Sequence, residues 1–386
     1  MIKEESNINE KYVSKFSKFT YVIINYVFIA TFISIYFLNN NNTLSSYENT
    51  RLINLIMTMI LLGLLFIYSI KELKLTLITY LLFLIMISIS VFVLLIRQYI
   101  IFHWIYLAFI ILLVKIDIKI NVKLKKFMIY TSFIAVLYQM YSIRFLGSVP
   151  VLSWLDPNYS AYYIFMLSIF SRKSGNKLIS NVLILLGFLT LSRTYMVAII
   201  VYLLLEKSSF LNYLIIRIRI VNFFKLMIIS LIVLFTIGSF FIAIEREVTH
   251  FTSRGIERIF VINDLSNLHR FIANQKFVES IFSNPNYYLL GTKVEDYQNR
   301  VFINTPHNAF LSLIVNYGIL FTLPFIILYG ISLNKLIDKK NVPLIISQFI
   351  FYSLLGAGVQ GFPGILLFFT LREEHTDKNI KNNENA

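Results

Sequence analysis

Long apolar runs recur along the chain, and they limit the folds open to it more than any other feature. A helix that crosses the hydrocarbon core of a bilayer needs about 20 apolar residues. Hydrophobic residues make up 57% of the 386 residues and charged residues 14%, whereas soluble domains are about half apolar and a quarter charged. The sequence therefore predicts an all-α, polytopic integral membrane protein.

Eleven or twelve membrane-spanning helices are expected from these runs. The shortest runs cannot cross a bilayer upright, so we expect them to be tilted, broken or buried among neighbours. The predicted spans are residues 21–38, 52–70, 75–96, 99–114, 127–143, 159–171, 178–191, 194–205, 226–244, 309–333, 342–358 and 361–371.

Nearly all of the length lies in spans, which indicates one membrane domain with a single large polar insertion. The expected parts are a cytoplasmic N-terminal segment (1–20), a first part of the transmembrane bundle (21–244), a large extracytoplasmic loop (245–307), the last part of the bundle (308–371) and a polar disordered tail (372–386).

Alternate loops differ in positive charge, and this difference predicts the orientation. If the N-terminus is cytoplasmic, the inner loops are basic, with five lysines in residues 115–126 alone. The short outer loops offer only single arginines. This positive-inside pattern places residues 245–307 on the outer face. The net charge of +15 then belongs beside anionic membrane lipid, and nucleic acid is not expected as a partner.

Arg193 is the most informative outer arginine, because it lies between two apolar runs with almost no loop. A guanidinium at that depth is costly unless it is paired or hydrated. It is either an anchor that snorkels to the interface or a group that grips an anion, since its fork matches phosphate oxygens.

The large loop has balanced charges, which favours a folded segment over a general binding surface for polyanions. Phe271, Phe277 and Ile281 are spaced for an amphipathic helix that starts near Asn267, and Pro285 follows its expected end. Arg270 would lie in its first turn, either as an ordinary surface arginine or as part of an anion site.

His307 stands at the end of the loop, directly before a long apolar run. An unperturbed imidazole accepts a proton near neutral pH, as a general base for an attacking hydroxyl must. The alternative is a histidine that caps the helix or sits at the interface. Asp156, in Asp156-Pro157-Asn158 before another run, is a helix-capping candidate, and Arg144 precedes it as an interfacial anchor or a phosphate ligand.

Several kinds of chemistry have no motif in the chain. There is no cysteine, Walker loop, dinucleotide-binding glycine motif, H-E-x-x-H or Asp-x-Asp pair, so neither a metal nor a cofactor is expected. We also see no internal repeat, whereas many carriers are built from repeated halves.

In this order, the residues between about 150 and 335 resemble the O-antigen ligase and polymerase family. The likeness rests on a Ser-Arg step between short spans, a late and single large outer loop, and a Pro-His-Asn-x-x-Leu run into a span. The residues that carry it are Asp156-Pro157-Asn158, Ser192-Arg193, Arg270, Pro285, Gly291, Pro306-His307-Asn308, Leu311 and Gly318. The chain departs from the family's pattern at His269, where a small residue is common, and in lacking a tryptophan after Arg270.

The resemblance implies a metal-independent, inverting glycosyltransferase with the membrane fold called GT-C, whose donor is a glycan on undecaprenyl diphosphate. By analogy, Arg193 and Arg270 bind the diphosphate and His307 orients or deprotonates the acceptor hydroxyl. Arg254, Arg144, Asn308 and Asp156 are further substrate contacts. The leading hypothesis is a polymerase of lipid-linked repeat units for a capsular or O-antigen-type polysaccharide, with a chain-length regulator as a further partner. A ligase of the same family and a flippase or transporter for the same lipids remain alternatives.

Overall fold

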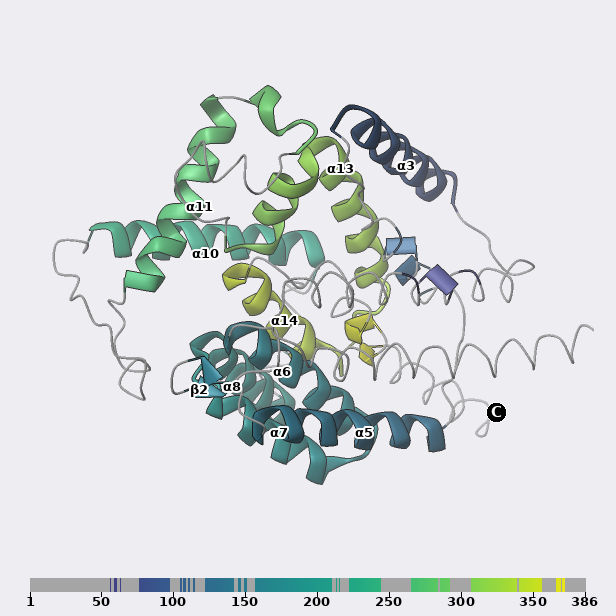
Figure 1. The fold of residues 1–386 in the computed structure, drawn as a ribbon, viewed down its shortest axis with the longest axis vertical. Coiled ribbons are helices and arrows are strands. Elements are labelled where there is room, and N and C mark those ends of the chain that lie inside the picture. Colours follow the sequence, from purple (N-terminus) through teal and green to yellow (C-terminus); the bar gives the residue numbers. More distant parts are fainter. Residues whose placement is uncertain are drawn as a thin grey trace, which may run out of the picture.

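The computed structural model describes residues 76–97, 122–141, 157–209, 222–243, 265–283, 285–291, 307–338 and 340–355, with isolated residues or short stretches elsewhere between 56 and 371. In this part of the chain the regular elements are helices, apart from one two-residue antiparallel ribbon (Figure 1). They are α3 (Leu77–Arg97), α5 (Val122–Tyr141), β1 (Phe145–Leu146), β2 (Val149–Pro150), α6 (Pro157–Lys173), α7 (Lys177–Leu189), α8 (Arg193–Lys207), α10 (Phe223–Ala243), α11 (Leu265–Ser283), the 3-10 helix η3 (Pro285–Tyr288), α13 (Ala309–Asn334) and α14 (Val342–Leu354).

Most of the predicted spans can be compared with a described helix. Eight of them coincide with α3, α5, α6, α7, α8, α10, α13 and α14, with ends that differ by at most five residues, so these runs are confirmed as helices. The predicted span 21–38 and the tail 372–386 lie outside the described residues. Of the spans 52–70, 99–114 and 361–371, only scattered residues are described, and these are helical.

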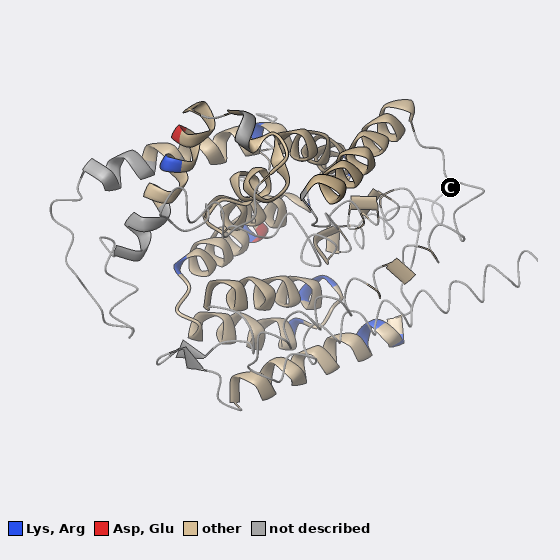
Figure 2. Cartoon of the chain, turned by 45° about the horizontal axis from the view of Figure 1, so that its top comes forward, with Lys and Arg blue, Asp and Glu red and all other residues tan. Residues whose placement is uncertain are grey.

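Two helices of the described part, α3 and α13, are long and apolar enough to cross a membrane by length and composition. The helices α7 and α14 and residues 223–233 of α10 are apolar but shorter. Figure 2 shows long stretches of helix without a charged residue. These features associate the chain with a membrane.

The helices differ in how much of their apolar surface is covered. Along α6, every residue from Ser160 to Ser171 is buried except Tyr163, which is half-buried, as expected of a helix that is apolar all round and enclosed by neighbours. By contrast, α3 leaves large apolar side chains exposed along its length, among them Leu77 at 72% and Leu95 at 74%. An extended apolar surface of this kind suits a lipid environment.

Basic loops meet at one end of the bundle. Arg172 at the end of α6 forms a bidentate ion pair with Glu206 near the end of α8, with an Nη2–Oε2 distance of 2.8 Å. Lys173 Nζ donates to Asn341 Oδ1 at 2.9 Å, and Asn341 Nδ2 donates to the Leu371 carbonyl at 3.0 Å. We call this the basic end, and it gathers three loops that the sequence predicts to be cytoplasmic.

The helix α13 lies at the predicted span, with its end one residue later, and it contains a break. Its backbone breaks at Gly318, with φ 78° and ψ 164°, so a first limb (309–317) and a second limb (319–334) meet there at an angle (Figure 1). Phe223 contacts both Phe310 in the first limb and Tyr329 in the second, with ring centroids 6.0 and 5.6 Å apart. The first limb therefore folds back toward the second.

Candidate functional site

A tight turn between α7 and α8 presents Arg193. The helix α7 ends at Leu189 and α8 begins at Arg193, so only Thr190, Leu191 and Ser192 connect them. Leu191 has φ 53°, and it is the one non-glycine residue in the described ranges with a positive φ. A left-handed leucine costs about 1–2 kcal/mol. Such strained residues concentrate at functional sites.

A close approach of α7 and α8 explains why the turn is so short. A Cβ added to Gly187 would overlap the ring of Tyr195, one turn into α8. The Tyr195 hydroxyl donates to the Ile184 carbonyl at 2.9 Å. The turn is thus held from inside the bundle, and the first residue of α8 has little freedom to move.

Ser192 ties this turn to the start of α6. Its Oγ accepts from the Tyr195 amide at 3.4 Å as the N-cap of α8, and it donates to Asn158 Oδ1 at 2.9 Å. Asn158 is the second residue of α6. The sequence analysis named Asp156 of the same tripeptide as a site residue, and Asp156 lies outside the described residues. The contact with Ser192 comes from Asn158.

Arg193 is half-buried and is the first residue of α8, which has no acidic side chain in its first turn. The N-termini of α6 and α8 meet here through the bond between Asn158 and Ser192. Helix N-termini carry partial positive charge and unpaired amide groups. A guanidinium beside two of them makes a local environment that favours an anion.

His307 is half-buried and directly precedes the N-cap of α13. The cap is Asn308, which is fully buried; its Oδ1 accepts from the Phe310 and Leu311 amides at 3.0 and 3.2 Å. Its Nδ2 donates to the Ser353 carbonyl in the last turn of α14, at 3.5 Å. His307 thus lies two residues before the first residue of α13, at the end of the loop. Asn308 engages its amide within the protein, so here it positions His307.

The helix α14 connects the two parts of the site. It packs against α8 and contacts α6, where Gln348 donates to the Tyr162 hydroxyl. Since α14 begins at the basic end beside Lys173 and runs away from it, its last turn lies toward the end that holds the starts of α6 and α8. Asn308 thus links His307, through Ser353, to the end of α14 that lies toward Arg193, and we call this side the Arg193 end. Figure 1 shows α14 between the α6–α8 group and α13.

The predicted helix of the large loop is present as α11, which begins at Leu265, two residues before the expected start, and ends before Pro285 as predicted. Phe277 and Tyr288 form one buried cluster with Leu311 and Val315 of the α13 first limb, and α11 packs against α10. Arg270 is the sixth residue of α11, so its position is in the second turn and not the first.

The loop also contacts the break in α13, backbone against backbone. Gly291 and Gly318 both have φ 78°. A Cβ on Gly291 would lie 2.6 Å from the Gly318 nitrogen, and a Cβ on Gly318 would overlap the Gly291 nitrogen. The Leu320 amide donates to the Leu289 carbonyl at 3.2 Å. The resemblance included both glycines, but nothing in the sequence indicated that they touch.

The remaining predicted residues and alternatives have these outcomes. Arg144 and Arg254 lie outside the described residues, and so does Asp156. No group of three or more His, Asp or Glu side chains that could hold a metal occurs within the described ranges.

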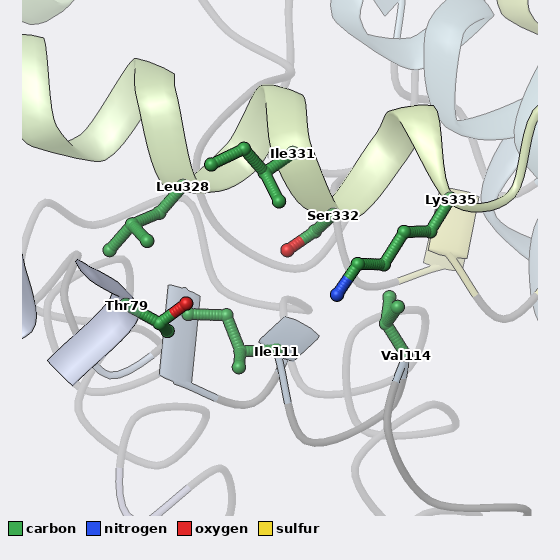
Figure 3. A pocket seen from close by; sticks show the side chains of 7 residues that line it. All are labelled: Thr79, Ile111, Val114, Leu328, Ile331, Ser332 and Lys335. Atoms are coloured by element: carbon green, nitrogen blue, oxygen red, sulfur yellow. The ribbon is translucent and has the colours of Figure 1, made fainter. Parts of the chain in front are cut away.

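A cavity of about 10 Å³, room for about one water molecule at most, is lined by Thr79, Ser332, Lys335 and apolar side chains (Figure 3). Lys335 precedes Leu336, whose carbonyl binds Asn341, so the cavity belongs to the basic end.

Comparison of the chain with protein-family models, with curated proteins and with solved structures gives no match in any of the three.

Proposed function

We propose that the chain is a polytopic membrane glycosyltransferase with about 11–12 spans, a GT-C-like bundle and a large loop on the outer face of a bacterial cytoplasmic membrane. It joins oligosaccharide repeat units linked to undecaprenyl diphosphate into a capsular or O-antigen-type polysaccharide. The observation that carries this proposal is the bond between Ser192 and Asn158, which sets Arg193 at the joined N-termini of α6 and α8.

The reaction needs two things from the protein, and the Arg193 end offers a candidate for each. The acceptor hydroxyl oxygen attacks the anomeric carbon, the bond from that carbon to the diphosphate oxygen breaks, and the electron pair leaves with undecaprenyl diphosphate. Fixed positive charge stabilises the anion that develops on this leaving group. Arg193 and the two helix N-termini supply that charge, and His307 takes the proton of the acceptor hydroxyl. Because the donor is already activated, no metal is required by this scheme.

His307 is fixed in place by its neighbour. Asn308 anchors the start of α13 to α14 through Ser353, so the backbone before it has a defined position. A general base must lie within hydrogen-bond reach of the proton it removes. We therefore treat His307 as the base and Asn308 as a positioning residue.

The test is an analysis of lipid-linked glycans in cells that lack the protein and are complemented with variants. Single repeat units should accumulate on the lipid carrier without the protein, and the wild type should restore polymer. Arg193→Ala and His307→Ala should fail to restore it while remaining in the membrane. Lys207→Ala is the matched control, because it removes an exposed cation from the other end of the same helix.

Other patterns of accumulation would contradict the proposal. Long polymer retained on the carrier would point to a ligase, and units trapped on the cytoplasmic face would point to a flippase. Full-length polymer with His307→Ala would remove that residue from the mechanism. A reporter at residue 286 that reads as cytoplasmic would overturn the orientation and the site with it.

A further inference from the structure

A buried asparagine in the large loop has no hydrogen-bond partner in the described part of the chain. Asn274 of α11 is 2% exposed, and neither its Nδ2 nor its Oδ1 has a partner. Burying an unpaired amide costs about 1–3 kcal/mol. Its neighbour Gln275 is exposed and donates to Glu279 at 2.8 Å. Among the buried side-chain amides of the described residues, Asn274 is the one with neither atom paired.

Asn274 belongs to the face of α11 that carries Phe277, which shares an apolar cluster with η3 and the α13 first limb. Residues three, four and seven apart share a helix face, so positions 270, 274, 277 and 281 follow one another along it. Phe277 is buried in the cluster with Leu311 and Val315, and Ile281 packs against that cluster. The buried part of this face thus includes Asn274 as well as Phe277.

The directions of the two helices bring Asn274 and His307 to the same side of this cluster. The C-terminal end of α11 leads through η3 to Leu289 and Gly291, which contact Leu320 and Gly318 at the end of the first limb. The two therefore run in the same direction, as Figure 1 shows. Asn274 precedes Phe277 by three residues and Asn308 precedes Leu311 by three, about 4.5 Å along each helix, so both lie on the N-terminal side of the cluster.

From this placement we propose that Asn274 binds a sugar of the lipid-linked donor, next to the group on which His307 acts. This inference rests on the proposed function and adds a specificity-determining residue to it. A side-chain amide both donates and accepts hydrogen bonds. Sugar hydroxyl and acetamido groups also do both, whereas diphosphate oxygens only accept. Asn274 therefore forms hydrogen bonds with the glycan, while Arg193 binds the diphosphate.

Binding to purified full-length protein in detergent separates these roles. One probe is lipid-linked glycan extracted from cells that lack the protein, and the other is undecaprenyl diphosphate without sugar. Asn274→Leu, close to isosteric, should bind the glycan lipid about tenfold more weakly and the sugar-free lipid as the wild type does. Arg193→Ala should weaken binding of both lipids. Gln275→Leu, the matched control in the next position, should leave both affinities unchanged.

Thermal unfolding of the same proteins tests the physical premise. Because Asn274 has no partner to lose, Asn274→Leu should raise the Tm or leave it unchanged. A Tm lowered below that of Gln275→Leu would mean that the amide bonds within the protein, and would overturn the inference. Unchanged affinity of Asn274→Leu for the glycan lipid would overturn it too, while leaving Arg193 and His307 in place. A wild type that binds neither lipid would overturn the proposed function itself and this inference with it.

Discussion

The two groups of helices that carry the candidate site are held together by different kinds of contact. Around Arg193, the helices α6, α7, α8 and α14 are joined by buried side chains, such as Tyr195 against α7 and Gln348 against Tyr162. Around His307, the α13 first limb is joined to the loop by a small apolar cluster and by the backbone contact of Gly291 with Gly318. Side-chain contacts can be weakened one at a time, whereas the backbone contact tolerates no side chain at all.

This difference has a chemical counterpart. The anion-binding part of the site needs charge at a fixed place, and a core packed on every side of α6 provides it. The part that holds His307 needs to admit an acceptor. It lies at the start of a limb of nine residues, whose two ends are fixed by Asn308 and by Gly318. We expect the two groups to respond very differently to substitution.

The largest expected effect is at the break in α13. In Gly318→Ala the methyl group meets the Gly291 backbone, and the left-handed conformation adds strain, so the free energy of unfolding should fall by more than about 3 kcal/mol. Gly175 has φ 84° with open space around it, so Gly175→Ala should cost only about 1 kcal/mol. Gly63 is helical with open space, and Gly63→Ala should be neutral or stabilising.

Thermal unfolding of the three purified glycine variants should give the lowest Tm for Gly318→Ala and the highest for Gly63→Ala. Equal Tm values for Gly318→Ala and Gly175→Ala would show that the loop does not press on the break, and the contrast between the two helix groups would be lost.

A smaller effect is expected in the α6–α14 core. Tyr162→Phe removes the hydroxyl that accepts from the buried Gln348 amide, whose Oε1 already lacks a partner in the described part of the chain. The free energy of unfolding should fall by about 1–3 kcal/mol. The double variant Tyr162→Phe with Gln348→Leu should recover much of that loss, because both polar groups are then absent. A double-mutant cycle without coupling would show that the bond contributes nothing.

Ser192→Ala should have a milder effect that reaches the site. It removes the N-cap of α8, a loss of about 1 kcal/mol, and the bond to Asn158. We expect a slightly lower Tm and shorter polymer, because Arg193 is then less firmly held. Ser192→Thr keeps a hydroxyl at the cap and should restore both readouts. Restored stability with polymer still short would indicate that Ser192 acts on substrate directly.

The smallest effect is expected at the basic end. The Arg172 and Glu206 side chains are 21% and 30% exposed, and pairs of this kind contribute about 0–1 kcal/mol. Arg172→Gln should lower the Tm slightly at low salt and less at high salt, because exposed charges are screened. A large loss that does not depend on salt would mean that the basic end supports the bundle more than its exposure suggests.

Much of the helical fold was predictable from the sequence, because span length and helix periodicity are local properties. The positions of α6, α8 and α11 follow from apolar runs, and those of α6 and α11 also from Pro157 and Pro285 at their ends. The break at Gly318 was not predictable, since glycine also occurs within apolar helices. It depends on Gly291, which is distant in sequence, and no local pattern reports a contact between two backbones.

The candidate site was predictable in part for the same reason. Arg193 and His307 stand out because charged and titratable side chains are rare beside apolar runs. Asn274 was missed, although a polar residue on the apolar face of a predicted amphipathic helix is a readable signal. The roles of Asn158 and Asn308 depend on Ser192 and Ser353, partners that only the packing of the helices supplies.

The contact between Gly291 and Gly318 also limits which substitutions related sequences can carry at these positions. Neither position accepts a side chain while the other backbone stays where it is, so a substitution at either one is not rescued by a change at the other. The stretch from Pro285 to Gly291 also has a fixed length, because an inserted residue would carry Leu289 away from Leu320. Related chains should therefore vary in loop length outside this stretch, and the two glycines should be kept or lost together.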